Sequence, residues 1–285
     1  MENFDAQLYH LVDEALKEDV GNGDHSTLCC IPADVKGKAV LKIKQEGILA
    51  GVDVAEKIFR YRKPAAQFIR HKNDGEVMQP GEVAFEVETQ VHAILQLERL
   101  VLNIMQRMSG IATLTREYTS LLEGTSTKLL DTRKTTPNFR LLEKEAVRIG
   151  GGVNHRFGLY DMIMLKDNHI DYCGGIEEAI GRAWDYVQRY DPQLKIEVET
   201  RSIEDVRRAV AAGRGKVFRL MLDNFTPEQI REALPLIGSE FETEASGGIN
   251  LHTIRAYADT GVNYVSVGGI IHQARSVDLS LKAVI

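Results

Sequence analysis

The sequence predicts an α/β protein in which a small α+β unit precedes an incomplete, open α/β barrel of about six parallel strands. Three observations support this fold class. The first 90 or so residues show short strands and helices without a regular alternation. A long helical stretch follows, and from Thr127 onward strand-like and helix-like segments alternate. Six such units in about 145 residues are too few for the roughly 250 residues of a complete eight-stranded barrel.

The amino-terminal part begins with an amphipathic segment and a turn. Apolar residues at helical spacing predict a helix over residues 7–18, which ends before Gly21-Asn22-Gly23-Asp24. We interpret that stretch as a structural turn in which Asp24 caps backbone amides. Beyond it, we expect strands at 38–48, 68–69, 76–78 and 83–87 and a helix at 54–61.

A long helical zone over residues 92–122 separates the two halves of the sequence. It is apolar over a broad face, as a helix that bridges domains or subunits would be, and we expect a break near Ser109-Gly110. We therefore place an N-terminal domain, including this helix, at residues 1–112 and the barrel at 113–275. The last stretch, 276–285, is expected to return to the N-terminal domain.

The barrel is predicted from the alternation that follows. Its strands are expected at 127–131, 161–165, 194–199, 217–222, 241–245 and 263–267. Its helices are expected at 139–149, 176–189, 202–212, 227–236 and 250–259. Active sites of such folds lie at the carboxyl ends of the parallel strands, so the residues there are the candidates for function.

The composition limits the class of partner. The chain of 285 residues is 44% hydrophobic and 27% charged and carries a net charge of −6, which argues against nucleic acid or an anionic membrane surface. No apolar run is long enough to span a membrane, and the start MENFDAQLYH lacks the pattern of a signal peptide. Three cysteines without metal-site spacing predict a reduced, cytoplasmic protein.

Four cations lie in loops at the ends of predicted strands: Arg133, His155, Arg156 and Lys166. Arginine binds a carboxylate through a forked pair, whereas lysine acts as a point charge, so such a set suits a planar dicarboxylate. Any one of them could instead form an internal salt bridge. Because all four are in loops at strand ends, we favour a small-molecule acid site.

Carboxylates follow the next strands. Glu197 and Glu199 are two residues apart and face one side of a strand, where buried charge is unfavourable unless it is paired or bound to metal. With Asp223 at the next strand end, they could hold Mg²⁺ and the ribose hydroxyls of a diphosphate sugar. The alternative is that they only neutralise nearby Lys and Arg side chains.

Glycine-rich turns follow the last two strands, at Ser246-Gly247-Gly248 and Gly268-Gly269. Glycine lets backbone amides approach a phosphate, and the next helix terminus adds a favourable dipole. The loops after the last two strands are the usual phosphate site of barrels. Two such turns on adjacent strands therefore predict a phosphate site, although either turn alone is weak support.

The motifs DTRKTTP, EKEAVRIGGGVNHRFGLYD and LKDNH, between Asp131 and His169, resemble quinolinate phosphoribosyltransferase (nicotinate-nucleotide pyrophosphorylase, carboxylating). The resemblance runs nearly end to end, from the GNGD at Gly21 to the SVGG that ends at Gly269. It implies an N-terminal α/β sandwich joined to an open-sided barrel. It also implies transfer of phosphoribose from phosphoribosyl pyrophosphate to quinolinate with release of CO₂, a step of NAD biosynthesis.

The resemblance assigns roles to individual residues. Arg133, His155, Arg156 and Lys166 correspond to the quinolinate pocket, and we place Thr132 beside them. Lys134 corresponds to a residue at the reacting centre or the pyrophosphate. Glu199 and Asp223 correspond to the direct contacts of ribose and Mg²⁺, with Glu197 as support. We expect Lys134, Lys166, Glu199 and Asp223 to carry the catalysis.

The resemblance also implies a homodimer with an active site shared between subunits, and the dimers could assemble further into a hexamer of three dimers. Arg99, in the context ER…LN, corresponds to an arginine that reaches the partner's quinolinate site. The alternative for Arg99 is an ordinary salt bridge, for example with Glu98.

Three departures from the family pattern remain. Asn138 stands where glycine is more usual, Gly269 stands where alanine is common, and residues 214–219 resemble an insertion at the far face of the barrel.

Three other functions are considered as alternatives. They are a molybdenum-associated paralogue with another substrate, a Schiff-base aldolase using Lys134 or Lys166, and a phosphosugar sensor without catalysis.

Overall fold

The computed structural model describes residues 4–284, and these form two compact units. The first unit comprises the described residues up to Arg116, the segment Thr135–Gly151 and the described residues from Ile270 onward. The second comprises Glu117–Lys134 and Gly152–Gly269. Across the described residues, no helix has the length and apolar character needed to cross a membrane.

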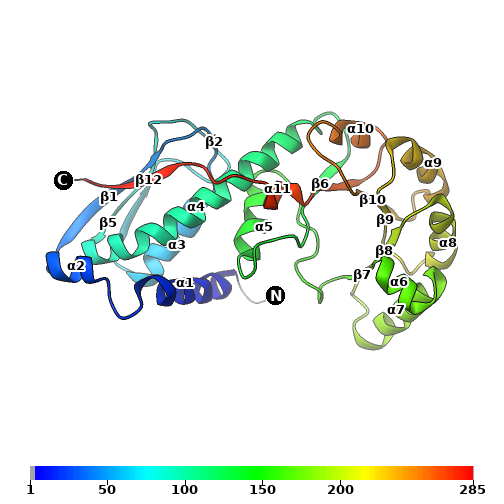
Figure 1. Ribbon diagram of the computed structural model, residues 1–285, viewed down its shortest axis with the longest axis horizontal. Coiled ribbons are helices and arrows are strands. Elements are labelled where there is room, and N and C mark those ends of the chain that lie inside the picture. Colours follow the sequence, from blue (N-terminus) through cyan, green and yellow to red (C-terminus); the bar gives the residue numbers. More distant parts are fainter. Residues whose placement is uncertain (1–3, 285) are drawn as a thin grey trace. The chain divides into compact units, whose positions relative to one another are not determined.

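An antiparallel sheet with the strand order β12-β1-β5-β3 forms the centre of the first unit. Its strands are β1 (Lys36–Ile43), β3 (Gln67–Arg70), β5 (Val83–Gln90) and β12 (Leu279–Val284). Apolar residues alternate along β1, so Ala39, Leu41 and Ile43 are buried on one face. β12 pairs with β1 from Ile43 to Lys38, which brings residues 279–284 onto this sheet (Figure 1).

The strand expected over 38–48 is interrupted. β1 ends at Ile43, and Gly47 starts a separate two-residue strand, β2 (Gly47–Ile48), which pairs with β4 (Val77–Met78). Gly47 has a positive φ of 156°, and a Cβ there would lie 2.5 Å from the Thr113 hydroxyl oxygen. The chain therefore approaches the long helix closely at Gly47 and leaves the first sheet.

The helices of the first unit pack around a core rich in aromatic rings. They include α1 (Phe4–Val20), α3 (Val52–Arg62) and α5 (Arg140–Ile149). Phe59 of α3 makes an edge contact with Phe85, which stacks on Phe68 with ring centroids 4.4 Å apart. A short helix that we did not expect, α2 (His25–Cys30), follows the GNGD turn. Asp24 caps it by accepting the Thr27 N–H at 3.1 Å, which confirms the structural interpretation of that turn.

The long helix α4 (Val91–Ser120) is continuous, so the break expected near Ser109-Gly110 is wrong. Both residues serve packing instead. The Ser109 hydroxyl donates to the Ala50 carbonyl at 3.1 Å and accepts the Ala50 N–H at 2.9 Å. A Cβ on Gly110 would lie 2.0 Å from the carbonyl oxygen of Arg275, so only glycine allows that segment to approach the helix.

The second unit contains a six-stranded parallel sheet in the order β6-β11-β10-β9-β8-β7, which confirms the predicted α/β fold with an open barrel. The strands are β6 (Lys128–Leu130), β7 (Ile163–Leu165), β8 (Ile196–Thr200), β9 (Arg219–Asp223), β10 (Glu242–Ser246) and β11 (Tyr264–Ser266). β6 pairs only with β11 among these strands, and β7 only with β8. The barrel is therefore open between β6 and β7.

Amphipathic helices cover the outside of this sheet (Figure 1). They are α6 (Asp167–Cys173), α7 (Ile176–Tyr190), α8 (Ile203–Gly213), α9 (Pro227–Ile237) and α10 (Ile254–Ala258). Local signals fix their starts: Ser202 accepts the Asp205 N–H, and Thr226 forms a capping box with Gln229 ahead of Pro227. Two short helices were not expected, α6 directly after Lys166 and α11 (Gly269–His272).

Candidate active site

The parallel strands bring the predicted carboxylates to one edge of the second unit. Alternate residues of a strand face the same side, so Glu197 and Glu199 of β8 share a face. On β9 and β10, Asp223 is level with Ser246, and the Ser246 hydroxyl donates to the Asp223 carboxylate. The burial of this edge differs by position: Glu199 is 6% exposed, whereas Asp223 is half-buried.

The end of β6 leads into a turn that presents the first cations. Asp131 is fully buried and accepts the His155 N–H at 2.8 Å, which ties this strand end to the following loop of the same unit. The Thr132 hydroxyl accepts the Lys134 N–H at 3.1 Å. Arg133 is half-buried and Lys134 is exposed. The sequence did not single out Asp131 as more than the start of a motif.

Arg133 and Arg156 lie close enough to influence one another. Burial, and next the charge of Arg133, lower the pKa of the Arg156 guanidinium. Arg156 Nη1 also donates to the Met162 carbonyl at 3.1 Å, which holds the side chain beside the start of β7. Two neighbouring guanidinium groups repel each other, and a bound anion would relieve the repulsion. The pair therefore has the electrostatic character of an anion site.

Lys166 sits at the junction of β7 and α6. Its backbone N–H donates to Nδ1 of His169 at 3.0 Å, and the Asp167 N–H donates to Glu199 at 3.3 Å. Its Nζ lies 2.9 Å from Glu199 Oε2. Glu199 is thus neutralised by a lysine, as the alternative interpretation of the carboxylates proposed.

The residues predicted to hold Mg²⁺ have the donor chemistry that the ion requires. Burial, and next the charge of Glu199, raise the pKa of Asp223. Carboxylates that repel each other in this way suit a divalent cation, which accepts oxygen ligands and removes the repulsion. Glu199 and Asp223 therefore fit a Mg²⁺ site. Asn224, which the sequence did not suggest, donates through Nδ2 to Asp223 at 2.7 Å.

The turn after β10 requires its glycine. Gly247 has a positive φ of 96°, and a Cβ there would lie 3.0 Å from the backbone nitrogen of Asn224. The Asn224 N–H donates to the Ser246 carbonyl at 2.7 Å, so the turns after β9 and β10 are joined. Because α10 begins only at Ile254, Gly247 and Gly248 precede the helix by several residues. Gly268 follows β11, and Gly269 is the first residue of α11.

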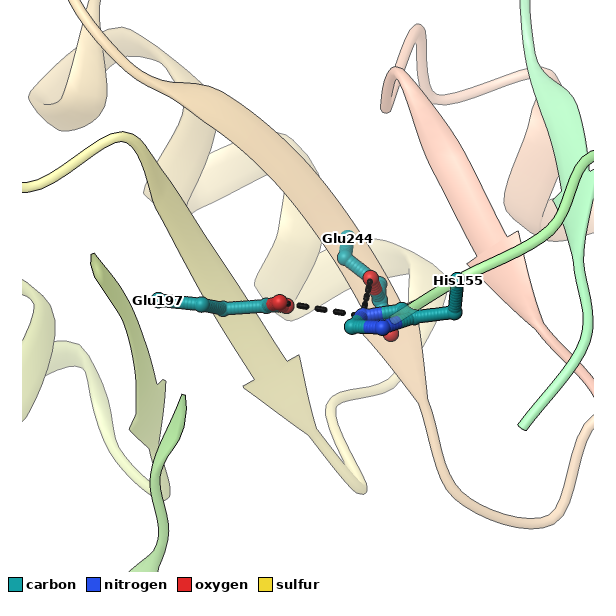
Figure 2. Close-up of side chains that lie close together, drawn as sticks. All are labelled: His155, Glu197 and Glu244. Carbon is teal, nitrogen blue, oxygen red and sulfur yellow. Dashed lines mark ion pairs between the residues drawn. The ribbon is translucent and has the colours of Figure 1, made fainter. Parts of the chain in front are cut away.

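A buried charged group that the sequence did not predict lies deeper in the barrel. His155 Nε2 is 3.0 Å from Glu197 Oε2 and 3.2 Å from Glu244 Oε2 (Figure 2). Arg219 Nη1 is 3.1 Å from Glu244 Oε2. Burial lowers the pKa of His155, but the two carboxylates outweigh it and raise that pKa to about 9. Burial and the charge of Glu244 raise the pKa of Glu197 to about 7.

Arg219 corrects one interpretation of the sequence. We assigned it to an insertion at the far face of the barrel, but it is the first residue of β9 and only 6% exposed. It pairs in register with Glu197 on one side and Glu242 on the other. Its guanidinium carbon lies 4.2 Å from the centre of the Tyr264 ring. The alternation in ETEAS, which matches that in IEVET, is the signal that could have revealed this charged row.

Arg99 belongs to the first unit and lies on α4. It is exposed on α4, one turn before the exposed Asn103 and one turn after Leu95, which is 41% exposed. These three residues lie on one face of the helix because their spacing is four.

Comparison with known proteins covers nearly the whole chain. The sequence model of the family "Quinolinate phosphoribosyl transferase, N-terminal domain" matches residues 24–109. The sequence model of the corresponding C-terminal domain matches residues 111–282. The chain belongs to the quinolinate phosphoribosyltransferase family.

Relatives in this family are similar along their length. The probable nicotinate-nucleotide pyrophosphorylase [carboxylating] of Bacillus subtilis is 44% identical over 275 residues, which cover 96% of this chain and 93% of that protein. The mitochondrial quinolinate phosphoribosyltransferase [decarboxylating] 2b of Nicotiana tabacum is 41% identical, with 94% of this chain and 80% of that protein covered. The crystal structure of NadC from Streptococcus pyogenes has a TM-score of 0.90 at 38% identity and covers 100% of both chains.

One departure from the quinolinate phosphoribosyltransferase pattern has a structural explanation. Asn138, where glycine is more usual, has a positive φ of 61°. Asparagine tolerates this left-handed conformation better than other residues with a side chain. Asn138 is therefore compatible with the left-handed backbone of the loop after Pro137.

Proposed function

We propose that this chain transfers the phosphoribosyl group of phosphoribosyl pyrophosphate to the ring nitrogen of quinolinate. The products are nicotinate mononucleotide, pyrophosphate and CO₂, as in de novo NAD biosynthesis. Family membership over both domains supports this activity.

One observation carries the substrate assignment. Two partly buried arginines, Arg133 and Arg156, stand close enough for one to lower the pKa of the other, and Lys166 directly follows β7. This set of cations suits the two carboxylates of quinolinate. The carboxylates Glu199 and Asp223 lie at the same edge and suit the ribose hydroxyls. The site thus has a cationic part for the acid and an anionic part for the sugar.

The proposed reaction uses both the cationic and the anionic part of the site. Pyrophosphate leaves C1 of the ribose with the bonding electron pair, and C1 becomes oxocarbenium-like. We assign Lys134, which is exposed in the turn after β6, to stabilise the departing charge. The nitrogen lone pair of quinolinate bonds to C1. The bond to the 2-carboxylate then breaks, CO₂ leaves, and the remaining electron pair, stabilised by the adjacent ring cation, takes a proton from solvent.

Mg²⁺ is the proposed cofactor, held by Glu199 and Asp223. When bound, it supplies positive charge that balances the diphosphate. The phosphate groups are assigned to the turns after β10 and β11, through Ser246, Gly247, Gly248, Gly268 and Gly269. Gly247 supports this assignment because its positive φ and close approach to Asn224 require glycine.

We further propose a homodimer whose active sites are shared, with a hexamer of three dimers as a larger assembly. Arg99 is exposed on α4 beside the apolar Leu95, which supports a role for this face in contact with a second chain. We also propose a cytoplasmic location. The free cysteines Cys29, Cys30 and Cys173 support it, because thiols persist in reducing compartments.

The alternatives are less well supported. Lys166, one of the two lysines proposed for a Schiff base, is engaged with Glu199. A molybdenum-associated paralogue with a different substrate would not need the cations suited to a dicarboxylate. A phosphosugar sensor would not require the paired Glu199 and Asp223.

Substrate choice tests the proposal. Nicotinate lacks the 2-carboxylate, so it would neutralise fewer of the partly buried cations, and we expect kcat/KM for nicotinate to be at least about 10³-fold lower than for quinolinate. Initial rates with each acid at saturating phosphoribosyl pyrophosphate measure the ratio. Equal turnover of the two acids would refute the assignment of the cations.

A further inference from the structure

Asn224 directly follows Asp223, the last residue of β9, and has an unusual backbone conformation. Its φ is 58°, in the left-handed region, and among the described residues only Asn138 shares this feature without being a glycine. Asparagine accepts the left-handed conformation at a lower cost than most residues, but glycine accepts it without that cost. What asparagine adds at this position is its side-chain amide.

The amide of Asn224 contacts the carboxylate of Asp223. Its Nδ2 donates to Asp223 Oδ2 at 2.7 Å. Neighbouring side chains of an extended strand point to opposite faces, so this contact would not form if β9 continued through Asn224. The left-handed backbone turns the chain at the end of the strand and brings the amide back to the carboxylate of the preceding residue.

The turn after β10 holds Asn224 in place. The Asn224 N–H donates to the Ser246 carbonyl at 2.7 Å. A Cβ on Gly247 would lie 2.2 Å from Asn224 Oδ1, so the amide oxygen packs directly against the backbone of Gly247. The next residue, Phe225, is 2% exposed and anchors the chain in the core. Although Asn224 is at the surface, its amide is therefore a fixed donor.

The Asp223 carboxylate requires such a donor because a second carboxylate lies near it. After burial, the charge of Glu199 is the largest cause of the raised pKa of Asp223. Two carboxylates that repel each other favour rotating apart, and hydrogen bonds to one of them oppose that rotation. Asn224 Nδ2 and the Ser246 hydroxyl supply these bonds. Carboxylates that bind metals are held by outer contacts of this kind.

We propose that Asn224 is a positioning residue: its amide holds the Asp223 carboxylate near Glu199, so that the two carboxylates bind Mg²⁺ together. The inference rests on the proposed function, because it takes Asp223 as a ligand of the metal. Asn224 acts through Asp223 and is assigned no contact with the substrates.

Asn224→Gly and the matched control Asn138→Gly test the role of the amide. Glycine accepts the left-handed backbone at both positions, and Asn224→Gly removes the donor to Asp223. We expect the half-saturating Mg²⁺ concentration of Asn224→Gly to rise about five- to tenfold, the effect of one hydrogen bond, while KM for quinolinate changes less than about twofold. Asn138→Gly should leave both values within about twofold of wild type.

Binding of Mn²⁺ gives a readout that does not depend on turnover. Mn²⁺ accepts the same oxygen ligands, and electron paramagnetic resonance measures its free fraction as it is titrated into each protein without substrates. The dissociation constant of Asn224→Gly should be about five- to tenfold that of the wild type and of Asn138→Gly. A change below about twofold in Asn224→Gly would overturn the inference. A wild type that binds no Mn²⁺, or a quinolinate KM that rises as much as the Mg²⁺ requirement, would also overturn it.

The Asn224 amide of the wild-type protein provides a measurement that needs no variant to fold. Its side-chain NMR signals should shift when Mg²⁺ is added, because the cation draws charge from the carboxylate that accepts the N–H. Signals that stay in place at a Mg²⁺ concentration that displaces bound Mn²⁺ would contradict the role of Asn224. If the wild type does not consume quinolinate, the proposed function fails, while the Mn²⁺ titration and the amide signals still decide whether Asn224 positions Asp223.

Discussion

Lys166 Nζ lies 2.9 Å from Glu199 Oε2 at the carboxyl edge of the parallel sheet. The lysine belongs to the proposed quinolinate site and the glutamate to the proposed sugar and metal site. Their ion pair therefore joins the two halves of the reaction. Each half must engage its own substrate, so removal of one partner should affect the two substrates differently.

Glu199→Ala should weaken the use of Mg²⁺ and phosphoribosyl pyrophosphate. The half-saturating Mg²⁺ concentration should rise at least about tenfold, because one proposed oxygen ligand is lost. Quinolinate affinity should stay within about fivefold of wild type or tighten, because Lys166 is released from a partly exposed ion pair. Calorimetric titration of quinolinate and Mg²⁺-dependent initial rates measure both effects.

Asp171→Ala is the matched control, since Asp171 lies on the adjacent helix α6 and pairs with Arg201 at the surface. It should leave both properties unchanged. A collapse of quinolinate affinity in Glu199→Ala with unchanged metal dependence would mean that the two halves are assigned wrongly. Asp223→Ala should behave as Glu199→Ala does for the metal.

The buried pair of Arg107 and Glu143 predicts a large effect on stability in the first unit. Arg107 Nε and Nη2 donate to Glu143 Oε1 at 3.0 and 2.9 Å, and Glu143 is fully buried. Glu143 also accepts the Thr136 N–H at 2.8 Å, so it fixes the loop after Lys134. Arg107→Met should lower the free energy of unfolding by about 3–5 kcal/mol, because it leaves the Glu143 carboxylate buried without its cation.

Arg148→Met serves as the comparison for this pair. Arg148 meets Glu145 at the surface of the same helix α5, and such pairs contribute about 1 kcal/mol or less. Urea unfolding followed by circular dichroism gives both values. Similar losses of unfolding free energy in the two variants would show that the buried pair stabilises the protein no more than the surface pair does.

Complementation tests the shared active site. Arg99→Ala and Lys166→Ala should each be nearly inactive, whereas heterodimers of the two should regain part of the wild-type rate, because one of their two sites has both native residues. Co-expression with distinct affinity tags allows the heterodimer to be purified and assayed.

The control mixes Lys166→Ala with Asp223→Ala, both from the second unit. No site in that heterodimer is intact if each site takes its barrel residues from one chain, so its activity should stay at the parental level. Heterodimers of Arg99→Ala and Lys166→Ala that remain as inactive as their parents would rule out the shared site.

Periodicity and strand-end chemistry predicted the barrel well because they depend on local sequence. The alternation after Thr127 predicted the parallel sheet, and the polar strand ends predicted residues that lie at one edge. Each of these signals is contained in a few neighbouring residues. Lys166 illustrates the limit of such local signals. It was predicted as a cation of the site, but its ion pair with Glu199 could be predicted only if the pairing of the strands were known.

Contacts between distant segments could not be predicted in this way. Gly110 was interpreted as a helix break. Glycine is required there for another reason, because the Arg275 carbonyl, 165 residues later, packs against it. Likewise, Glu244 and Arg219 form a charged pair only once the register of β9 and β10 is known. Composition could not distinguish Arg219 from the surface arginines around residue 214.

Release of CO₂ from carboxyl-labelled quinolinate tests the central claim most directly. The purified protein should release one CO₂ for each nicotinate mononucleotide formed, and only when phosphoribosyl pyrophosphate and Mg²⁺ are both present. Omission of either should abolish the release, since decarboxylation follows formation of the bond between the ring nitrogen and C1. Release without phosphoribosyl pyrophosphate, or no release with all components present, would contradict the proposed function.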